Sequence, residues 1–270
     1  MIPGRAPDSD RGRPPAAPAP APTVVIIGGF LSSPPMYWRM RDRLVARGAR
    51  AVHIAPIWLP DWVLVAVRGQ GPVATRSART VLAASEAAAG VPLLVVGHSA
   101  GGIVARILTA EAPFDGRRFS GAGRIGAVVT LGCPHVNAME AATSRRSGVY
   151  PTAFVDEHVP GAFWAPRIGY LSVGSRWMVG LAGEHGVRRF YERLLTPPYP
   201  DVIEGDGLIP VASAMLPGAR EVVLDDAAHG QGSRHAWYGS DKIIDEWWPS
   251  AIDVWRSALA ARAGSAAAPA

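Results

Sequence analysis

Short apolar runs alternate with helix-favouring segments along most of the chain. β-Branched and aliphatic residues dominate four runs, which predicts strands that are buried on both faces. These runs are at 23–27, 50–55, 91–97 and 124–131. Helical patterns lie between them, at about 34–47, 73–89 and 101–111. Strands that alternate with helices predict βαβ crossovers, so we expect a doubly wound α/β fold with a mostly parallel sheet.

The alternation breaks after the fourth run. Residues 136–168 have weak periodicity, three prolines and several aromatics, which suits a small cap insertion over the sheet. The runs at 168–173 and 220–224 predict two further strands, and 241–261 predicts a closing helix. We expect Pro249 to kink or split that helix, because a proline removes a backbone donor.

Low-complexity segments rich in Pro and Ala flank this pattern at 1–22 and 263–270, and we expect both to be disordered. The domain is therefore expected to span 23–262, with the cap at about 136–168. Hydrophobic residues make up 49% of the 270 positions and charged residues only 18%, which excludes extensive disorder. A chain of this length suits one large domain rather than two.

Charge and cysteine content exclude several classes of function. Cys133 is the only cysteine, which excludes an internal disulfide framework and a cysteine-based zinc site. The net charge of +5 would suit nucleic acid, but the basic residues are scattered and form no stripe interleaved with aromatics. We therefore predict no nucleic-acid partner, and no obligate protein partner.

Neither a secretory signal nor a membrane span is predicted. The N-terminal segment lacks the apolar stretch that a signal peptide needs. The run at 54–67 comes closest to a membrane-spanning length, but Pro56, Pro60 and Asp61 interrupt it. We expect a cytoplasmic protein, with export by another route left open.

The segment with the most chemical information lies at 97–101, which reads GHSAG. It follows an apolar run and opens a helical segment, which is the setting of a nucleophile elbow. A serine hydroxyl is a weak nucleophile, so it has to be exposed and held beside a base. A tight strand-to-helix turn does this, and the flanking glycines leave room for neighbouring chain. We predict Ser99 as the nucleophile, in preference to an ordinary glycine-rich turn.

Two backbone N–H groups are expected to form an oxyanion hole. The first belongs to Ala100, immediately after the nucleophile. The second is expected from the loop at 28–33, where we favour the N–H of Phe30 over that of Leu31. The alternative interpretation of this loop is a plain turn in which Phe30 fills a hydrophobic gap.

The acid and the base of such a site follow the serine in the order Asp or Glu, then His. The turn at 205–210, GDGLIP, offers Asp206 between two glycines, although a solvated turn would also explain this sequence. The competing acids are Asp201, Glu204, Asp225 and Asp226. His229 lies a few residues past the last strand and is predicted as the base, with His235 as its rival. His135 is expected to be structural.

Together these segments resemble the lipase-like serine esterase branch of the α/β-hydrolase superfamily, over roughly 23–261. Ser99 matches the nucleophile in the GHSAGG segment, 131–135 resembles LGTPH, and 205–210 resembles the GDGxVP acid loop. Residues 223–229 and 237–240 are similar to the His loop and following segment of little-characterised plant and cyanobacterial members. That similarity favours His229 over His235.

Two departures from this family accompany the resemblance. Gly28 and Gly29 stand where lipases often have His-Gly, and Cys133 replaces a usual Thr. The resemblance implies an α/β-hydrolase fold and hydrolysis of carboxylic esters through an acyl-enzyme, without a metal or cofactor.

Several side chains near the predicted loops and cap are expected to contact substrate, although core packing is the default explanation for any single aromatic. They are Leu31, His98, Trp58, Trp62, Phe163 and Trp164. We expect a serine esterase or lipase for small-molecule or lipid esters of moderate to long acyl chains, with transient contact with a membrane surface. An acyltransferase, a thioesterase or a lipid deacylase on the same triad is the alternative among enzymes. A catalytically silent ligand-binding protein is the alternative from another class.

Overall fold

A parallel β-sheet forms the centre of the protein. The computed structural model describes residues 20–138, 151–232 and 234–267. Within these residues, six strands pair in the order β2-β1-β3-β4-β5-β8, and every pair is parallel. The strands are β1 (Thr23–Ile27), β2 (Ala51–Ile54), β3 (Leu93–His98), β4 (Ile125–Leu131), β5 (Gly169–Ser175) and β8 (Arg220–Leu224). The predicted α/β class with a mostly parallel sheet is confirmed.

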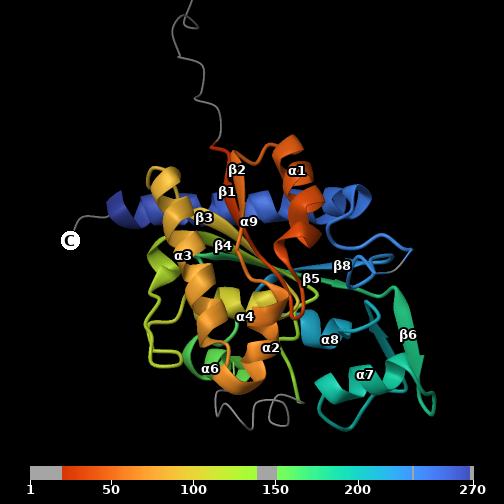
Figure 1. Ribbon diagram of the computed structural model, residues 1–270. Helices are drawn as coiled ribbons and strands as arrows, with labels where there is room; N and C mark the ends of the chain where they lie inside the picture. The colour runs from red at the N-terminus through yellow and green to blue at the C-terminus, as the bar shows by residue number, and fades with distance from the viewer. Residues whose placement is uncertain (1–19, 139–150, 233, 268–270) are drawn as a thin grey trace, which may run out of the picture.

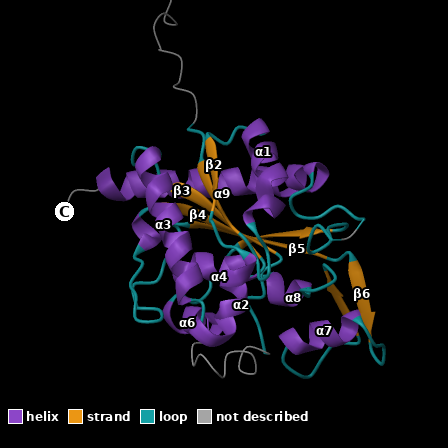
Figure 2. Ribbon diagram, viewed as in Figure 1, coloured by secondary structure: helices purple, strands orange, loops and turns teal. Residues whose placement is uncertain are grey.

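Helices cover both faces of this sheet (Figures 1 and 2). One face carries α3 (Gly71–Ala87) and α4 (Ala100–Ile107), with α2 (Leu59–Arg68) and α6 (Pro151–His158) further out. The other face carries α1 (Trp38–Ala46), which continues the short 3-10 helix η1 (Pro34–Tyr37), and α9 (Asp241–Ala267). A second short 3-10 helix, η2 (Gly121–Gly123), precedes β4.

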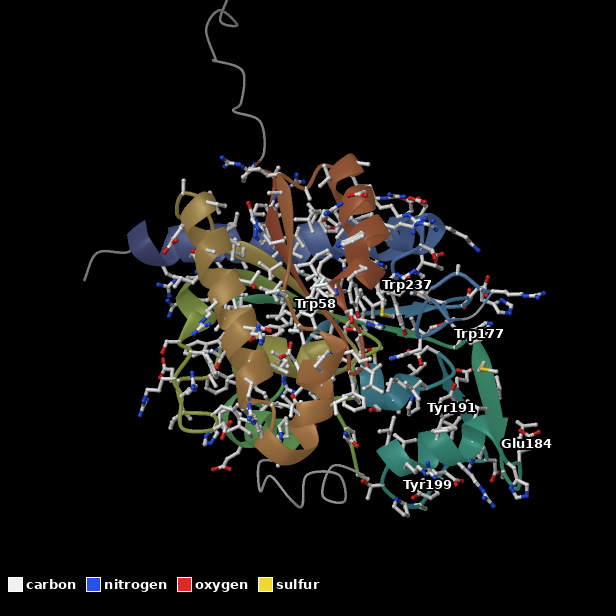
Figure 3. The ribbon with its side chains drawn as sticks, viewed as in Figure 1. Trp58, Trp177, Glu184, Tyr191, Tyr199 and Trp237 are labelled. Atoms are coloured by element: carbon white, nitrogen blue, oxygen red, sulfur yellow. The ribbon has the colours of Figure 1, made fainter. Side chains whose placement is uncertain are left out.

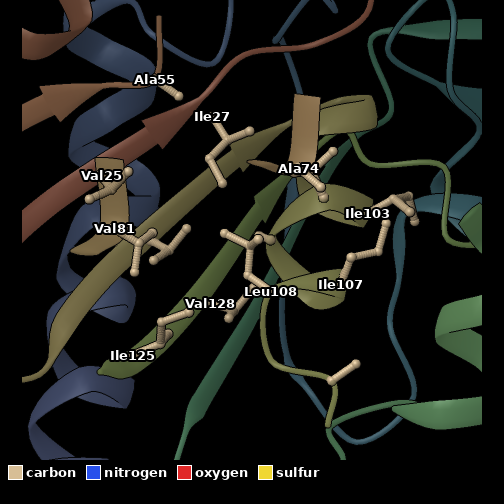
Figure 4. Packing of buried hydrophobic residues seen from close by; sticks show 14 of the residues in the cluster. Val25, Ile27, Ala55, Ala74, Val81, Ile103, Ile107, Leu108, Ile125 and Val128 are labelled. Carbon is tan, nitrogen blue, oxygen red and sulfur yellow. The ribbon is translucent and has the colours of Figure 1, made fainter. Parts of the chain in front are cut away.

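The core divides between the two faces because successive strand residues point to opposite sides. On β1, Val25 and Ile27 pack with residues of α3 and α4, as Figure 4 shows. Val24 and Ile26 of the same strand pack toward α1 and α9. All five residues of β1 are buried, which explains why the strand reads as a continuous apolar run.

Between β5 and β8 the chain makes an excursion that the apolar pattern does not predict. It contains β6 (Met178–Leu181), α7 (Val187–Leu194), β7 (Val202–Gly205) and α8 (Val211–Ala214). β6 and β7 pair antiparallel and, with α7, form a small lobe beside the main sheet (Figure 1). β6, β7 and α8 are each only four residues long, and segments this short do not show a clear periodic pattern.

Three further differences from the sequence-based expectations concern helices. α2 overlaps the interrupted apolar run at 54–67, where the sequence predicts no helix. Pro60 falls in the first turn of α2, where a proline is tolerated. α9 is a single helix that contains Pro249 and continues to Ala267, beyond the expected domain end at 262. The guanidinium of Arg262 donates to four backbone carbonyls, of Arg167, Gly123, Ala122 and Ile125, and so holds the end of α9.

Of the expected cap at 136–168, residues 139–150 lie outside the described residues, as do 1–19 of the N-terminal arm. The described part of the cap consists of α6 and the loop that leads to β5. Among the helices that the structure describes, none combines the length and apolar character that crossing a membrane would require.

Candidate active site

Ser99 occupies a sharp turn between β3 and α4. Its backbone has φ 53° and ψ −129°, in the left-handed region that non-glycine residues rarely adopt. A Cβ on Gly97 would lie 2.5 Å from Gly102 Cα, and one on Gly101 would collide with Ile27 O. The flanking glycines therefore let β3, α4 and β1 approach closely enough to hold Ser99 in this strained conformation.

Asp206 and His229 are brought together from two distant loops. Nδ1 of His229 lies 2.8 Å from Oδ2 of Asp206, and the backbone N–H of His229 donates to Asp206 O at 2.9 Å. Asp206 follows β7 of the small lobe and His229 follows β8, so the excursion between β5 and β8 positions the acid. The carboxylate is buried, with 1% exposure.

Three further donors surround the Asp206 carboxylate. The backbone N–H groups of Leu208 and Ile209 donate to Oδ1 at 3.0 and 2.7 Å, and the Tyr238 hydroxyl donates to Oδ2 at 2.9 Å. Burial raises the pKa of Asp206, but the charge and hydrogen bond of His229 and the two backbone donors outweigh it, so the pKa is below its ordinary value. Asp206 is therefore ionised at neutral pH and can orient the His229 ring.

Gly132 makes this arrangement possible at the end of β4. Its φ is +52°, and a Cβ there would lie 2.5 Å from Asp206 Oδ2 and 2.8 Å from the Tyr238 ring. This close approach explains the glycine in the LGCPH segment.

His229 contacts His98, the neighbour of Ser99 in the chain, and makes no direct bond to Ser99 itself. The His229 ring is 4.9 Å from the ring of His98, the residue that precedes the nucleophile. Within the described residues, Ser99 Oγ makes no hydrogen bond to His229. Catalytic hydrogen bonds are often long without substrate and shorten when it binds. His235 instead lies against Trp177, with ring centroids 4.8 Å apart.

The turn after β1 lies directly beside Ser99. A Cβ on Gly29 would lie 2.7 Å from Ser99 Cβ. The N–H of Ser32 donates to Gly29 O at 3.1 Å, which makes Phe30 and Leu31 the central residues of a β-turn, with Leu31 at φ +60°. The turn therefore brings the predicted Phe30 donor close to the nucleophile, and Ala100 opens α4 beside it.

His98 has both ring nitrogens engaged by protein groups. Nδ1 is 2.9 Å from the Tyr37 hydroxyl, and Nε2 is 2.8 Å from His229 O. This residue, expected to contact substrate, thus directs its polar atoms to the protein.

The aromatic residues expected at the substrate site differ in their surroundings. Trp62 is buried, and Phe30 packs edge-on against it with ring centroids 5.7 Å apart. The Nε1 of Trp164 donates to Thr109 O at 3.0 Å and so fixes the cap loop. Trp58 and Phe163 are half-exposed, and Leu31 likewise. Figure 3 shows Trp58 well apart from the lobe residues Tyr191 and Tyr199.

A groove of about 730 Å³ lies beneath the cap, lined by Phe163, Met215, His135 and Arg106 among others. Arg106 lies seven residues after Ser99, on the helix that the nucleophile turn opens. His135 is buried, with Thr130 Oγ1 3.1 Å from its Nε2.

Cys133 is buried, and desolvation raises the pKa of its thiol to about 12. It therefore packs as a small protonated side chain. Within the described residues, no group of three His, Cys, Asp or Glu side chains is placed to hold a metal ion.

Sequence reasoning did not identify Tyr238 and Tyr37 as parts of the site. Tyr238 belongs to the segment at 237–240, for which the sequence indicates a family resemblance and no role in the site. Its hydroxyl donates to the Asp206 carboxylate. Tyr37 lies eight residues after Gly29 in η1, where its hydroxyl accepts the Gly29 N–H at 3.0 Å. No local pattern marks either tyrosine, since both act across segments distant in sequence.

Comparisons with known proteins agree with this architecture. No family model matches the chain, and no curated protein sequence matches it. A Bacillus licheniformis lipase, BlEst2 in mature form, is 17% identical with a TM-score of 0.57, covering 90% of this chain and 96% of that one. Thermogutta terrifontis esterase 2 phosphoramylated by tabun is 16% identical with a TM-score of 0.51, covering 86% and 81%.

Phospholipase PlaB from Legionella pneumophila, in complex with thio-NAD, is 12% identical with a TM-score of 0.54, covering 87% of this chain and 58% of that one. These comparisons lend no support to the narrower similarity to plant and cyanobacterial members, which stays a prediction. The order of the strands in the sheet, the turn at Ser99 and the likeness to these structures all indicate the same fold. The chain has the α/β-hydrolase fold.

Proposed function

We propose that this protein is a serine hydrolase that cleaves carboxylic esters through an acyl-enzyme intermediate. The observation that carries the proposal is the Asp206–His229 hydrogen bond, 2.8 Å long, in a fold that holds Ser99 at a strained turn nearby. Both features cost free energy, since one buries a carboxylate and the other holds a non-glycine residue at positive φ. A site that uses them in catalysis gives a reason for both.

The proposed reaction uses each group in turn. His229 accepts the proton of Ser99 as Oγ attacks the ester carbonyl, and Asp206 holds Nδ1–H and stabilises the imidazolium that forms. The N–H groups of Ala100 and Phe30 would stabilise the oxyanion of the tetrahedral intermediate. Collapse transfers the His229 proton to the leaving alcohol and gives an acyl-Ser99 ester. A water molecule, activated by His229, then releases the acid.

Exposed apolar side chains around the turn support an ester with an apolar acyl chain. Phe30 and Leu31 are 56% and 50% exposed, and Trp58 and Val63 of the neighbouring α2 segment are 48% and 61% exposed. The Phe30–Trp62 contact joins these two segments. Such grouped apolar exposure is typical of a binding surface.

Hydrolysis of a series of p-nitrophenyl esters from acetate to palmitate tests the proposal. We expect turnover by the wild type, a higher kcat/KM for butyrate or longer chains than for acetate, and loss of turnover in Ser99→Ala. Retention of wild-type rates by Ser99→Ala would contradict the role of the serine. An inactive wild type on every ester would favour a ligand-binding protein instead.

A further inference from the structure

A continuous chain of hydrogen bonds joins the two loops that flank Ser99. The N–H of Gly29 donates to the Tyr37 hydroxyl oxygen at 3.0 Å, and that hydroxyl lies 2.9 Å from Nδ1 of His98. Nε2 of His98 lies 2.8 Å from the carbonyl oxygen of His229. The chain thus begins in the turn after β1 and ends on the backbone of the proposed base.

For a neutral His98 ring, one assignment of protons satisfies all three bonds. A carbonyl oxygen can only accept, so Nε2 of His98 carries a hydrogen and Nδ1 of the neutral ring is an acceptor. Tyr37 must then donate its O–H to Nδ1, while its oxygen accepts the N–H of Gly29. Tyr37 is 1% exposed and His98 is 7% exposed, so water does not compete freely for these groups.

The surroundings of His98 keep its ring neutral. Burial and the charge of His229 lower the pKa of His98 to about 3, against smaller opposing effects of the His229 carbonyl and Asp206. The other rings that face it are those of Tyr37, Trp237 and Tyr238. Protonation at Nδ1 would remove the acceptor that Tyr37 needs, so the geometry agrees with a neutral ring.

Each end of the chain fixes a part of the proposed machinery. Gly29 is held at its N–H by Tyr37 and at its carbonyl by the N–H and hydroxyl of Ser32, at 3.1 and 2.6 Å. The backbone of His229 is held at its N–H by Asp206 O and at its carbonyl by His98. The His98 bond therefore helps to fix the backbone from which the His229 ring projects.

We propose that His98 and Tyr37 are positioning residues that fix the oxyanion turn and the His229 loop relative to one another. The proposal rests on the proposed esterase function. That reaction needs the Phe30 N–H and the His229 ring to be correctly placed around Ser99 at the same time. It also reassigns His98, because a ring with both nitrogens bound to protein has no polar atom for substrate.

Amide substitutions at position 98 separate the two bonds. A glutamine places its NH2 near the position of Nε2 and can still donate to His229 O, whereas asparagine is too short and places its oxygen near Nδ1. We expect kcat on p-nitrophenyl butyrate to fall about tenfold or more in His98→Asn, with KM within about twofold, and to fall only about two- to threefold in His98→Gln, which keeps the bond to His229 and loses the bond to Tyr37. Equal kcat losses in both variants, or none in His98→Asn, would overturn the proposal.

Tyr37→Phe tests the other end of the chain. We expect Tyr37→Phe to lower kcat about three- to tenfold. When it is combined with His98→Asn, the loss should be smaller than the sum of the two single effects in free energy, because both substitutions break the same chain of hydrogen bonds. Tyr170→Phe is the matched control, since Tyr170 is a buried tyrosine on β5 in the core of the other sheet face. It is expected to lower stability at most. Full additivity of the Tyr37 and His98 effects would contradict the shared chain.

An NMR readout separates this proposal from the proposed function. The Nδ1–H of His229, bonded to Asp206, should give a downfield proton resonance protected from solvent exchange in wild type and His98→Gln. We expect that resonance to broaden or vanish in His98→Asn at pH 7. An unchanged resonance in His98→Asn would overturn the positioning role, even if the wild type hydrolyses no ester. Inactivity with the expected NMR pattern would overturn the proposed function alone.

Discussion

The hydroxyl of Tyr238 donates a hydrogen bond of 2.9 Å to Oδ2 of Asp206, the same oxygen that faces Nδ1 of His229 at 2.8 Å. Tyr238 is fully buried, and burial together with the Asp206 charge raises its pKa well above its ordinary value. The tyrosine is therefore a permanent donor. It holds the carboxylate in the plane where one oxygen serves both the tyrosine and the histidine.

Removal of this donor is expected to weaken catalysis moderately. Tyr238→Phe leaves the backbone donors of Leu208 and Ile209 in place, so we expect kcat to fall about tenfold with KM unchanged. Asp206→Asn removes the charge and favours the wrong tautomer of His229, so a loss of about 10³- to 10⁴-fold is expected. Ester hydrolysis with purified variants measures both. Wild-type kcat in Tyr238→Phe would contradict this account of the tyrosine.

The two histidines after β8 should differ sharply in their effect on turnover. His229 bonds to Asp206, whereas His235 packs on Trp177. His229→Ala is expected to lower kcat by about 10³-fold or more, and His235→Ala to keep most of it. Steady-state kinetics of the pair decides the assignment, and the reverse ranking would move the base to His235.

A methyl group on Gly29 should disrupt the site without disturbing the core. It would lie 2.7 Å from Ser99 Cβ and 3.2 Å from His98 O, so the turn or the nucleophile has to move. We expect Gly29→Ala to lower kcat/KM at least about 100-fold. Gly123→Ala is the control, because a Cβ there meets no atom within 4 Å. Similar kinetics for the two variants would argue against close packing at the turn.

Two buried histidines should make the fold sensitive to acid. Burial lowers the pKa of His98 to about 3 and that of His135 well below its ordinary value of 6.5. In the unfolded chain both titrate near 6.5, so below that pH the unfolded state binds protons that the folded state cannot. The free energy of unfolding should therefore fall as the pH drops from about 6.5 toward about 3, by at most about 1.4 kcal/mol per unit for each histidine.

Urea unfolding at pH 7, 6, 5 and 4 measures this dependence. His98→Gln lacks one of the two groups, so its stability should fall less steeply with acid than that of the wild type. His185→Asn, which removes an exposed histidine, is the control and should follow the wild type. Parallel curves for wild type and His98→Gln would contradict a neutral, buried His98.

The central strands of the sheet could be predicted from the sequence because they are buried on both faces. β1 and β8 have the predicted bounds, although only β1 is buried throughout, and β8 is an edge strand that is mostly exposed. The lobe between β5 and β8 could not be predicted, because its strands are only four residues long, too short for a periodic pattern to be recognised. α2 could not be predicted, because Leu59, Val63 and Leu64 make its exposed face apolar too.

Residues of the candidate site could be predicted from the sequence where they belong to a short local motif. The elbow at Ser99 and the glycine-flanked Asp206 each lie in one short segment, and the structure brings Asp206 to His229. The supporting bonds of Tyr37 and Tyr238 were not predictable. Each joins segments far apart in the chain, so only the folded structure reveals the contact.

The proposed reaction requires Ser99 to be an activated nucleophile. Labelling of the purified protein with a fluorophosphonate, followed by mass spectrometry of the modified peptide, tests this most directly. We predict a single covalent adduct on Ser99 in the wild type, no adduct in Ser99→Ala, and labelling slowed by at least about 100-fold in His229→Ala. Absence of labelling in the wild type, or an adduct that persists in Ser99→Ala, would contradict the account.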